Sequence, residues 1–337
     1  MHTPVLNPRE LFVDALLTDV DGVHVKAKYD TTGNIEKGPD KDTDHHFELM
    51  KEYNKSGRNV PVILTSGRSL SQMMGIAKRS RNENMMIAEG GMIFYDPRTG
   101  TKSTIFEKIP EYQKYGDVVR TLSDMRNYLR EDLPNILARM NVDGMKTDRI
   151  VMPEGKEAMV TIDLPYNGAY GGLDVPRVDR LYTLKVVLER ISSDHRKMLY
   201  TKQEEFRELI PASDGEVEVH VDASAVNIRP PISKPDAIAH LIGDDGPLAK
   251  KYKITKVSQV GLVDDRDDQA MIKMYELGGN IYTVANASET TLSTVMLAYR
   301  NGGGGYISRH PDIRGFREIL MKINPTDPWM HSSHRHI

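Results

Sequence analysis

Short apolar runs that stop at polar turns constrain the fold of this chain more than any other feature. The run "ALL" at residues 15–17 precedes "TDVDG", "VPVIL" at 60–64 precedes "TSGRS", and "VGLV" at 260–263 precedes "DDRDD". The second and third turns lead into residues with helical spacing, such as "SLSQMMGIAKRS". Repeated units of strand, loop and helix favour a parallel sheet that is covered by helices.

The pattern changes at about residue 97. Residues 105–140 are charged and have helical spacing, whereas "KEAMVTIDLP" and "EVEVHVDASAVNIRP" alternate as antiparallel strands do. We therefore predict an α/β fold with a doubly wound, parallel-sheet (Rossmann-like) core, residues 1–96 and 226–337, and an inserted α+β cap domain, residues 97–225. Near the end, "NIYTVANASE" is predicted as the last strand, residues 302–305 as a glycine-rich loop, and "HSSHRHI" as a disordered tail.

Composition limits the kinds of ligand and site. The 337 residues suit two domains better than one. A formal net charge of −3 gives no electrostatic reason to expect nucleic acid or an anionic membrane as a partner, so we expect a small ligand. The absence of cysteine excludes disulfides, thiolate metal sites and cysteine nucleophiles. The sequence shows neither a signal peptide nor a membrane helix, so we expect a cytoplasmic protein, and its oligomeric state stays open.

Asp19 and Asp21 stand two positions apart where the first apolar run ends. Side chains two apart on a strand share a face, and Gly22 lets the chain bend directly after the second acid. Both carboxylates would then lie at the carboxyl end of a strand, where open α/β sheets bind ligands. A calcium-binding loop does not fit, because it needs Gly sixth and Glu twelfth, whereas Gly22 is fourth and Asp30 twelfth from Asp19. An exposed acidic turn remains an alternative for this pair taken alone.

Four turns of the α/β portion carry groups suited to a phosphate or a divalent cation. These groups are Asp19, Asp21, Ser66, Gly67, Lys234, Asp264, Asp265, Asp267 and Asp268. Taken singly, Ser66 also fits a helix N-cap, Lys234 a surface lysine, and the aspartates between 264 and 268 a charged helix start. Aspartates so close together repel one another unless a cation neutralises them. Taken together, the groups favour a phosphate and metal site at one edge of the sheet.

The order of these segments resembles the four motifs of the haloacid dehalogenase-like phosphohydrolases over nearly the whole chain. The segments are "DVDGV", "TSGR", "SKP" and "VDDRDDQAM". The resemblance is to the branch with a large cap after the second motif. Within it, "VDDRDDQAMIK" and "NIRPPISKPDAI" are most similar to trehalose-6-phosphate phosphatases, then to sucrose-phosphate and mannosyl-3-phosphoglycerate phosphatases. Val263 and Asp267 depart from the pattern, which usually has Gly and then Asn or Thr there, but neither departure removes a catalytic group.

The resemblance implies a role for each group. Asp19 would attack phosphorus and form an aspartyl-phosphate, and Asp21 would protonate the leaving oxygen and then take a proton from water. Lys234 would add positive charge and, with Ser66 and the Gly67 amide, bind the phosphoryl oxygens. Mg²⁺ is the implied cofactor, since this hard cation prefers oxygen ligands. The implied ligands are Asp19, the backbone carbonyl of Asp21, Asp264, water, and Asp268 or Asp265.

Substrate specificity would come from the inserted domain, because the four turns contact only the phosphate. "PEGKEAMVTI" resembles the Glu-x-Lys segment in the caps of trehalose-phosphate phosphatases, so Glu154 and Lys156 are candidates for contacts to sugar hydroxyls. Asn227 stands where that family often has Glu, and it is a further candidate for substrate binding, as is Arg68. The alternative for the cap residues is that they are solvated strand ends.

We therefore predict a Mg²⁺-dependent phosphatase that hydrolyses a phosphorylated sugar, trehalose-6-phosphate or a related compound, through an aspartyl-phosphate. Its partner would be this small-molecule phosphosugar. One alternative is a phosphosugar mutase or phosphotransferase of the same fold, which returns the phosphoryl group to a sugar instead of to water. The other is a non-catalytic phosphosugar-binding protein, and the presence of Asp19, Asp21, Lys234 and Asp264 argues against it.

Overall fold

The computed structural model of the chain describes residues 13–25, 41–55, 59–116, 118, 119, 122, 123, 126, 152, 154–163, 218–221, 225–243, 246–265 and 267–323. The chain divides into two compact units. The first holds Met1–Lys26, Gly38–Ile105 and Ser233–Ile337, and the second holds Ala27–Lys37 and Phe106–Ile232. Among the helices in the described ranges, none is both long enough and apolar enough to cross a membrane.

The first unit contains a sheet of eight strands in the order β11-β10-β9-β1-β2-β3-β4-β5. Their bounds are β1 (Ala15–Asp19), β2 (Val62–Thr65), β3 (Met86–Ala88), β4 (Ile93–Asp96), β5 (Thr101–Thr104), β9 (Val260–Val263), β10 (Asn280–Thr283) and β11 (Gly305–Ile307). The strands from β11 to β3 run parallel, whereas β4 and β5 are antiparallel additions. The chain winds outward from β1 in both directions, as in a doubly wound fold. The predicted α/β fold with a parallel-sheet core is confirmed.

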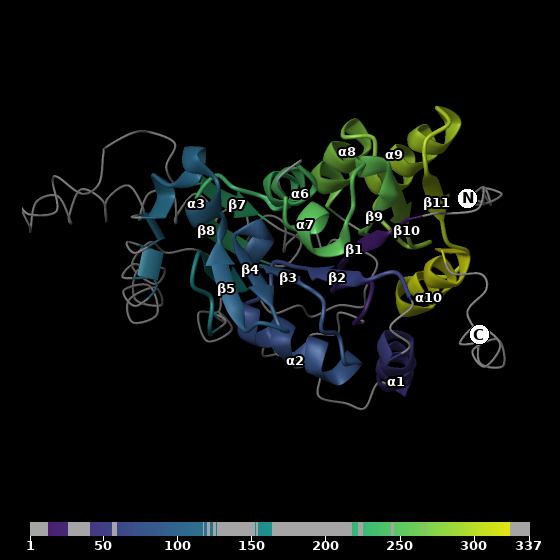
Figure 1. The fold of residues 1–337 in the computed structure, drawn as a ribbon, viewed down its shortest axis with the longest axis horizontal. Helices are drawn as coiled ribbons and strands as arrows, with labels where there is room; N and C mark the ends of the chain where they lie inside the picture. Colours follow the sequence, from purple (N-terminus) through teal and green to yellow (C-terminus); the bar gives the residue numbers. More distant parts are fainter. Residues whose placement is uncertain are drawn as a thin grey trace, which may run out of the picture. The chain divides into compact units, whose positions relative to one another are not determined.

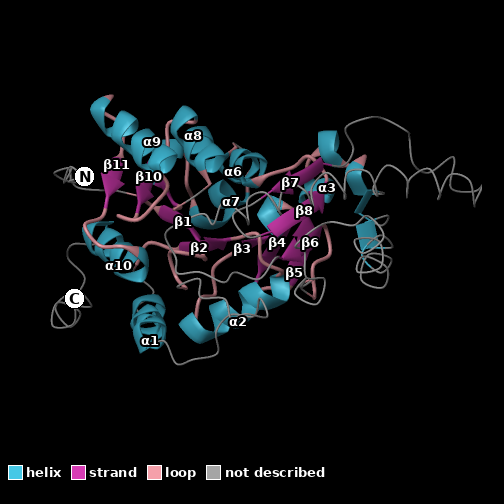
Figure 2. Ribbon diagram, turned by 180° about the vertical axis from the view of Figure 1, so that it is seen from behind, coloured by secondary structure: helices cyan, strands magenta, loops and turns pink. Residues whose placement is uncertain are grey.

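Helices cover both faces of this sheet (Figure 1, Figure 2). They are α1 (Lys41–Lys55), α2 (Leu70–Ser80), α6 (Lys234–Ile242), α7 (Pro247–Tyr252), α8 (Asp268–Glu276), α9 (Glu289–Arg300) and α10 (Asp312–Ile323), with 3₁₀ turns η1 (Glu89–Gly91) and η5 (Val257–Gln259). One face carries α6, α8 and α9, and the other carries α1, α2 and α10 (Figure 1). With both faces covered, β1 is buried along its whole length, which explains the continuous apolar run at residues 15–17 with which it begins.

β11 is a strand that the sequence pattern does not predict, so "NIYTVANASE" is not the last strand. The prediction that residues 302–305 form only a loop is wrong at Gly305, which pairs with Ile281 of β10. Glycine is needed here because α9 approaches closely: an added Cβ at Gly305 would lie 2.6 Å from the carbonyl oxygen of Val295. Glycine inside a strand often marks such a close backbone approach, and only the packing of the helix shows it.

The second unit contains, among its described residues, a three-stranded antiparallel sheet in the order β6-β8-β7. Its described elements include α3 (Ile105–Lys108), whose first residue belongs to the first unit, η2 (Pro110–Tyr112), β6 (Val160–Asp163), β7 (Glu218–Val221) and β8 (Ala225–Arg229). The antiparallel strands predicted from the alternating segments are confirmed. Most of the predicted helical residues 105–140, and the tail "HSSHRHI", lie outside the described residues. A role of residues 97–225 as a specificity cap stays a prediction.

Candidate active site

Three neighbouring strands of the core sheet end at one edge, and a polar group stands at each end. β1 ends at Asp19, which lies beside Thr65 at the end of β2, and Ser66 follows. On the other side of β1, β9 ends at Val263, and Asp264 follows. Because parallel strands present their carboxyl ends at the same edge of a sheet, these groups converge.

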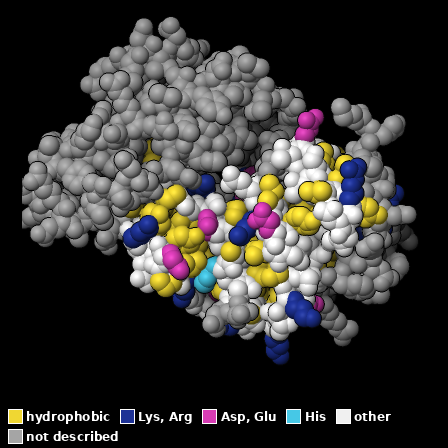
Figure 3. Space-filling model, turned by 90° about the horizontal axis from the view of Figure 1, so that it is seen from above, with side chains coloured by type: hydrophobic (Ala, Val, Ile, Leu, Met, Phe, Trp, Pro, Cys, Tyr) yellow, Lys and Arg dark blue, Asp and Glu magenta, His cyan; other side chains and the backbone are white. Residues whose placement is uncertain are grey.

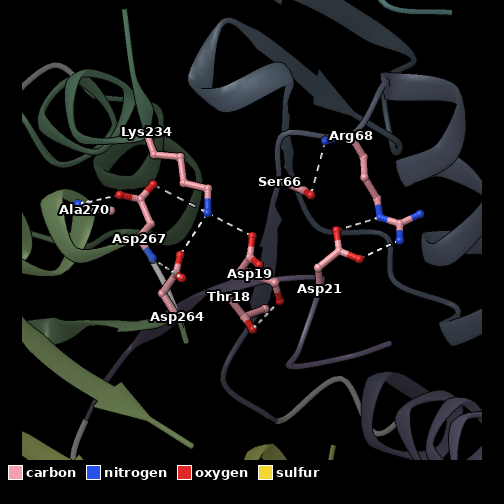
Figure 4. Close-up of polar contacts among 9 residues, drawn as sticks. All are labelled: Thr18, Asp19, Asp21, Ser66, Arg68, Lys234, Asp264, Asp267 and Ala270. Carbon is pink, nitrogen blue, oxygen red and sulfur yellow. Dashed lines mark hydrogen bonds and ion pairs between the residues drawn. The ribbon is translucent and has the colours of Figure 1, made fainter. Parts of the chain in front are cut away.

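Lys234, the first residue of α6, reaches this edge with its ammonium group (Figure 4). Its Nζ lies 2.9 Å from Asp19 Oδ1, 2.9 Å from Asp264 Oδ2 and 3.7 Å from Asp267 Oδ2. Burial lowers the pKa of Lys234, but the three carboxylates together outweigh burial and hold this pKa well above its usual value. Lys234 is therefore a fixed positive charge between the ends of β1 and β9.

Asp19, Asp264 and Asp265 form a buried acidic cluster, with one carboxylate oxygen of each within 4.8 Å of the others. Burial raises the pKa of Asp19 well above its usual value; Lys234 opposes this rise, and the neighbouring carboxylates, Asp264 foremost, add to it. Among the described residues, the three carboxylates of this cluster outnumber the single charge of Lys234, and a further cation would stabilise this excess of negative charge. Oxygen donors in this number suit a hard divalent cation such as Mg²⁺.

Asp267, one of the two departures from the family pattern, has a structural role besides its charge. Its Oδ1 accepts a hydrogen bond of 3.0 Å from the Ala270 amide and so caps α8. Its own amide donates to Asp264 Oδ1 at 2.9 Å, while the other oxygen of Asp264 accepts from Lys234. These bonds tie the start of α8 to the acidic cluster and fix the orientation of the Asp264 carboxylate.

Asp21, Ser66 and Arg68 lie on the other side of Asp19 (Figure 4). Arg68 donates two hydrogen bonds to Asp21, from Nε to Oδ2 at 2.9 Å and from Nη2 to Oδ1 at 2.6 Å. Ser66 is buried, and its hydroxyl accepts a hydrogen bond of 3.3 Å from the Arg68 amide, whereas Gly67 is exposed. The arginine that we predict to bind substrate is thus bonded to the predicted acid–base residue.

The predicted cap residues lie in the second unit. Lys156 Nζ donates to Thr161 Oγ1 at 2.5 Å, and this hydroxyl donates to Asn227 Oδ1 at 2.7 Å. All three residues are buried, whereas Glu154 is exposed. Sequence reasoning missed Thr161, which lies opposite Asn227 in the pairing of β6 with β8. The alternation of "MVTID" was the available signal, because cross-strand neighbours on one face of a sheet contact each other.

The structure brings seven of the predicted site residues together in the first unit: Asp19, Asp21, Ser66, Gly67, Arg68, Lys234 and Asp264. Asp265, one of the two alternatives for a further metal ligand, lies within the acidic cluster. The side chain of the other alternative, Asp268, lies outside the described residues. The catalytic, phosphate-binding and metal-binding roles of these residues stay predictions.

No family model and no curated protein matches the sequence. Among solved structures, the C-terminal domain of trehalose-6-phosphate phosphatase from C. albicans is 13% identical; the likeness covers 96% of this chain and 97% of that one, with a TM-score of 0.53. A haloacid dehalogenase-like hydrolase from Bacteroides thetaiotaomicron is 13% identical over 92% of this chain and 98% of that one, with a TM-score of 0.47. The likeness to the C. albicans domain shows a shared fold and nothing finer.

Proposed function

From the haloacid dehalogenase-like fold of this chain, which was predicted and is confirmed, we propose that the protein hydrolyses phosphate monoesters and that its substrate is a phosphorylated sugar. The observation that carries this proposal is the position of Lys234 Nζ, 2.9 Å from both Asp19 Oδ1 and Asp264 Oδ2. A fixed cation beside a carboxylate, at the carboxyl edge of a parallel sheet, suits an anionic substrate and a carboxylate nucleophile. The name of the C. albicans relative supports a sugar phosphate as the substrate class.

The proposed cofactor is Mg²⁺, because the acidic cluster offers the oxygen donors that this cation prefers. Asp19, Asp264 and the backbone carbonyl of Asp21 would hold it, together with Asp265 or Asp268. When bound, the ion would reduce the repulsion between the Asp19 carboxylate and the phosphate. The raised pKa of Asp19 supports this need, since the ionised nucleophile is costly in the cluster without a further cation.

The reaction would take place in two steps. In the first, an Asp19 carboxylate oxygen bonds to phosphorus while the bond from phosphorus to the sugar oxygen breaks, and the sugar oxygen takes a proton from Asp21. In the second, a water oxygen bonds to phosphorus, the bond to Asp19 breaks, and Asp21 takes the proton that the water loses. The products are the sugar and inorganic phosphate, and both aspartates return to their starting states.

Ser66, the Gly67 amide and Lys234 are the proposed ligands of the phosphoryl oxygens. The raised pKa of Lys234 keeps its ammonium charged at neutral pH, so it can neutralise charge on the phosphate throughout the reaction. Gly67 is exposed, and an added Cβ there would meet no described residue within 4 Å, so the described part of the chain leaves room for a ligand beside its backbone. These groups act on the phosphate alone and leave the choice of sugar to other residues.

The distribution of charge on one face of the described residues bears on the kind of partner. On the face seen in Figure 3, the acidic and basic side chains of the described residues are scattered among hydrophobic and uncharged ones. Proteins that bind nucleic acids gather Lys and Arg into a basic patch or stripe. That face offers no such patch within the described part of the chain.

A screen of phosphorylated sugars for released phosphate tests the proposal, with Asp19→Asn as the decisive variant. The amide has the shape of the carboxylate but is a poor nucleophile, so turnover should be lost while thermal unfolding shows an intact fold. Asp44→Asn, at an exposed position on α1, is the matched control and should keep wild-type turnover. Near-normal turnover by Asp19→Asn would contradict the mechanism. Recovery of an isomerised sugar phosphate in place of free phosphate would contradict hydrolysis.

Glu154, Lys156 and Asn227 are the proposed contacts to sugar hydroxyls. Replacement of Lys156 or Asn227 by Ala should weaken transition-state binding of the sugar phosphate by about 1–3 kcal/mol, measured as kcat/KM, and spare a small aryl phosphate. Because Thr161 bonds to both residues, the losses in the double variant should be less than additive. Equal losses on both substrates would contradict a role in sugar binding.

A further inference from the structure

The ion pair between Arg68 and Asp21 has a geometry that fixes the carboxylate. Its two bonds, 2.9 Å from Nε to Oδ2 and 2.6 Å from Nη2 to Oδ1, occupy both carboxylate oxygens (Figure 4). The Arg68 side chain is 10% exposed and that of Asp21 30% exposed, so the arginine is the better buried partner. A planar guanidinium that donates two parallel bonds sets both the position and the plane of a carboxylate.

The main chain of Arg68 is held in place on both sides of the residue. Its carbonyl accepts a hydrogen bond of 3.0 Å from the Glu89 amide, and the Ser66 carbonyl accepts one of 3.0 Å from the Gly90 amide. Glu89 has a φ of +53°, a conformation that is strained for a non-glycine residue and persists only where the surrounding structure enforces it. Ser69, the next residue after Arg68, is the N-cap of α2. The guanidinium is therefore presented from a firmly anchored loop.

The main chain around Asp21 is held by a turn, whereas the position of its carboxylate depends on Arg68. Asp21 begins the turn that closes at Val25, where the Gly22 amide donates to the Val25 carbonyl at 2.9 Å. Its carboxylate takes its hydrogen bonds from Arg68 among the residues that the structure describes. Without these bonds the carboxyl group of a partly exposed aspartate is free to rotate about its side-chain torsions.

We propose that Arg68 is a positioning residue, which orients the Asp21 carboxyl group for proton transfer to the leaving oxygen and so acts through Asp21. The inference rests on the proposed function, since it concerns the acid–base residue of that reaction. A general acid must lie within hydrogen-bond reach of the leaving oxygen at the moment when the bond to phosphorus breaks. A guanidinium that donates two parallel bonds to Asp21 serves that geometry.

Two aryl phosphates of similar size and different leaving groups separate the two roles of Arg68. 4-Nitrophenolate leaves without a proton, whereas the more basic phenolate depends on protonation. Arg68→Met should lower kcat for phenyl phosphate by about 10- to 100-fold, part of the roughly 10²–10⁴-fold that acid–base catalysis contributes. The same variant should lower kcat for 4-nitrophenyl phosphate by at most about threefold, because its leaving group needs no proton. Arg68→Lys should not restore phenyl phosphate turnover, because an ammonium cannot make the paired bonds.

The double variant Arg68→Met, Asp21→Asn tests whether Arg68 acts through Asp21. If it does, adding Arg68→Met to Asp21→Asn should change kcat for phenyl phosphate by less than about twofold. Inorganic phosphate binding, measured by calorimetry, should be the same within about twofold in Arg68→Met and wild type, because the proposed role involves no phosphoryl contact. Arg79→Met is the matched control, because it removes an exposed ion pair in which Arg79 donates a hydrogen bond to Asp44. This variant should leave the turnover of both aryl phosphates unchanged.

Three outcomes would each overturn the inference: equal losses of kcat on the two aryl phosphates, additive losses in the double variant, or weakened phosphate binding. Arg68 would then bind the substrate or stabilise the fold. In all three of these outcomes the wild type still hydrolyses phosphate monoesters, so the proposed function stands. If the wild type hydrolyses neither aryl phosphate nor any sugar phosphate, the proposed function is wrong, and so is the inference that rests on it.

Discussion

Gly22 lies beside the acidic cluster in a backbone conformation that residues with a side chain rarely adopt, with a φ of +74°. An added Cβ would lie 2.7 Å from Asp265 Cγ, so a side chain at this position would displace the Asp265 carboxylate. The glycine that lets the chain bend after Asp21 is therefore also required by the proposed cation site. This second requirement comes from a residue more than two hundred positions away in the sequence.

Gly22→Ala should lower both stability and Mg²⁺ affinity. The left-handed conformation costs an alanine about 1–2 kcal/mol, and the displaced Asp265 can no longer approach Asp19 and Asp264. Denaturant unfolding would measure the first effect and titration calorimetry with Mg²⁺ the second. Gly75→Ala in α2 is the matched control, because an added Cβ there meets no described residue within 4 Å and alanine favours a helix. Unchanged Mg²⁺ binding by Gly22→Ala would argue against Asp265 as a ligand.

At the scale of elements, the start of α2 anchors the end of the loop that carries Arg68, because the N-cap of the helix is the next residue, Ser69. Ser69 Oγ accepts a hydrogen bond of 3.4 Å from the Gln72 amide, and Gln72 Oε1 accepts one of 3.1 Å from the Ser69 amide. This reciprocal pair is a capping box, which the local sequence "SLSQ" encodes. Because Ser69 is fully buried, its hydroxyl has no solvent alternative to these bonds.

Ser69→Ala should destabilise the protein by about 0.5–2 kcal/mol, the usual cost of removing an N-cap side chain. Urea unfolding measures the change. Lys78→Ala, at an exposed position near the end of α2, is the control, and it should be close to neutral because alanine favours the helix. Similar losses in the two variants would mean that the cap hydroxyl does not stabilise α2.

At the scale of the whole molecule, a buried histidine pair joins three distant segments of the first unit. His24, after β1, and His46, in α1, lie 3.0 Å apart from Nδ1 to Nε2. The His24 ring packs against Phe316 of α10, with ring centroids 4.3 Å apart. Burial lowers the pKa of His24 to about 3, and burial, followed by His24 and Arg317, lowers the pKa of His46 well below its usual value. Both rings are therefore neutral in the folded protein at neutral pH.

The histidine pair predicts a loss of stability in mild acid. In the unfolded chain these histidines bind protons near pH 6.5, whereas in the folded chain they bind protons only at lower pH. Their contribution to the free energy of unfolding is therefore complete above pH 6.5 and falls as the pH drops toward 3. Each histidine contributes at most about 1.4 kcal/mol per pH unit. Urea unfolding between pH 7.5 and 5 should show a slope that His24→Leu with His46→Leu reduces. His310→Gln, at a partly exposed position, should keep the slope; an unchanged slope in the double variant would contradict the prediction.

Mg²⁺ should stabilise the whole first unit, because it would bind carboxylates that repel one another in the fold. At one hundred times its dissociation constant, a ligand of the folded state adds about 2.7 kcal/mol to the free energy of unfolding. Asp265→Asn removes one charge of the cluster, so this variant should be more stable than wild type in a chelator and gain less from Mg²⁺. Thermal unfolding with Mg²⁺ and with chelator measures both. An equal gain in variant and wild type would exclude Asp265 from the site.

Local sequence was sufficient where a residue's role follows from its neighbours along the chain. The buried strand before Asp19, the strand before Asp264 and the helix that begins at Lys234 each follow from apolar runs and turn residues close by. The convergence of these turns follows from one topological rule, that parallel strands end at the same edge of a sheet. For this reason the fold class, and the gathering of Asp19, Ser66, Lys234 and Asp264, were predictable without the structure.

Contacts between distant segments were decided only by the tertiary structure. Arg68 and Asp21 are 47 positions apart, and nothing near either residue indicates that one holds the other. The same is true of the His24–His46 pair, of Thr161 beside Asn227, and of Gly305, whose strand depends on the approach of α9. A pattern of apolar and polar residues determines which face of a strand or helix is buried, but the partner of each polar side chain depends on the packing of whole elements. For this physical reason the sequence predicts which residues form the proposed site, and only the fold shows which of their side chains bond to one another.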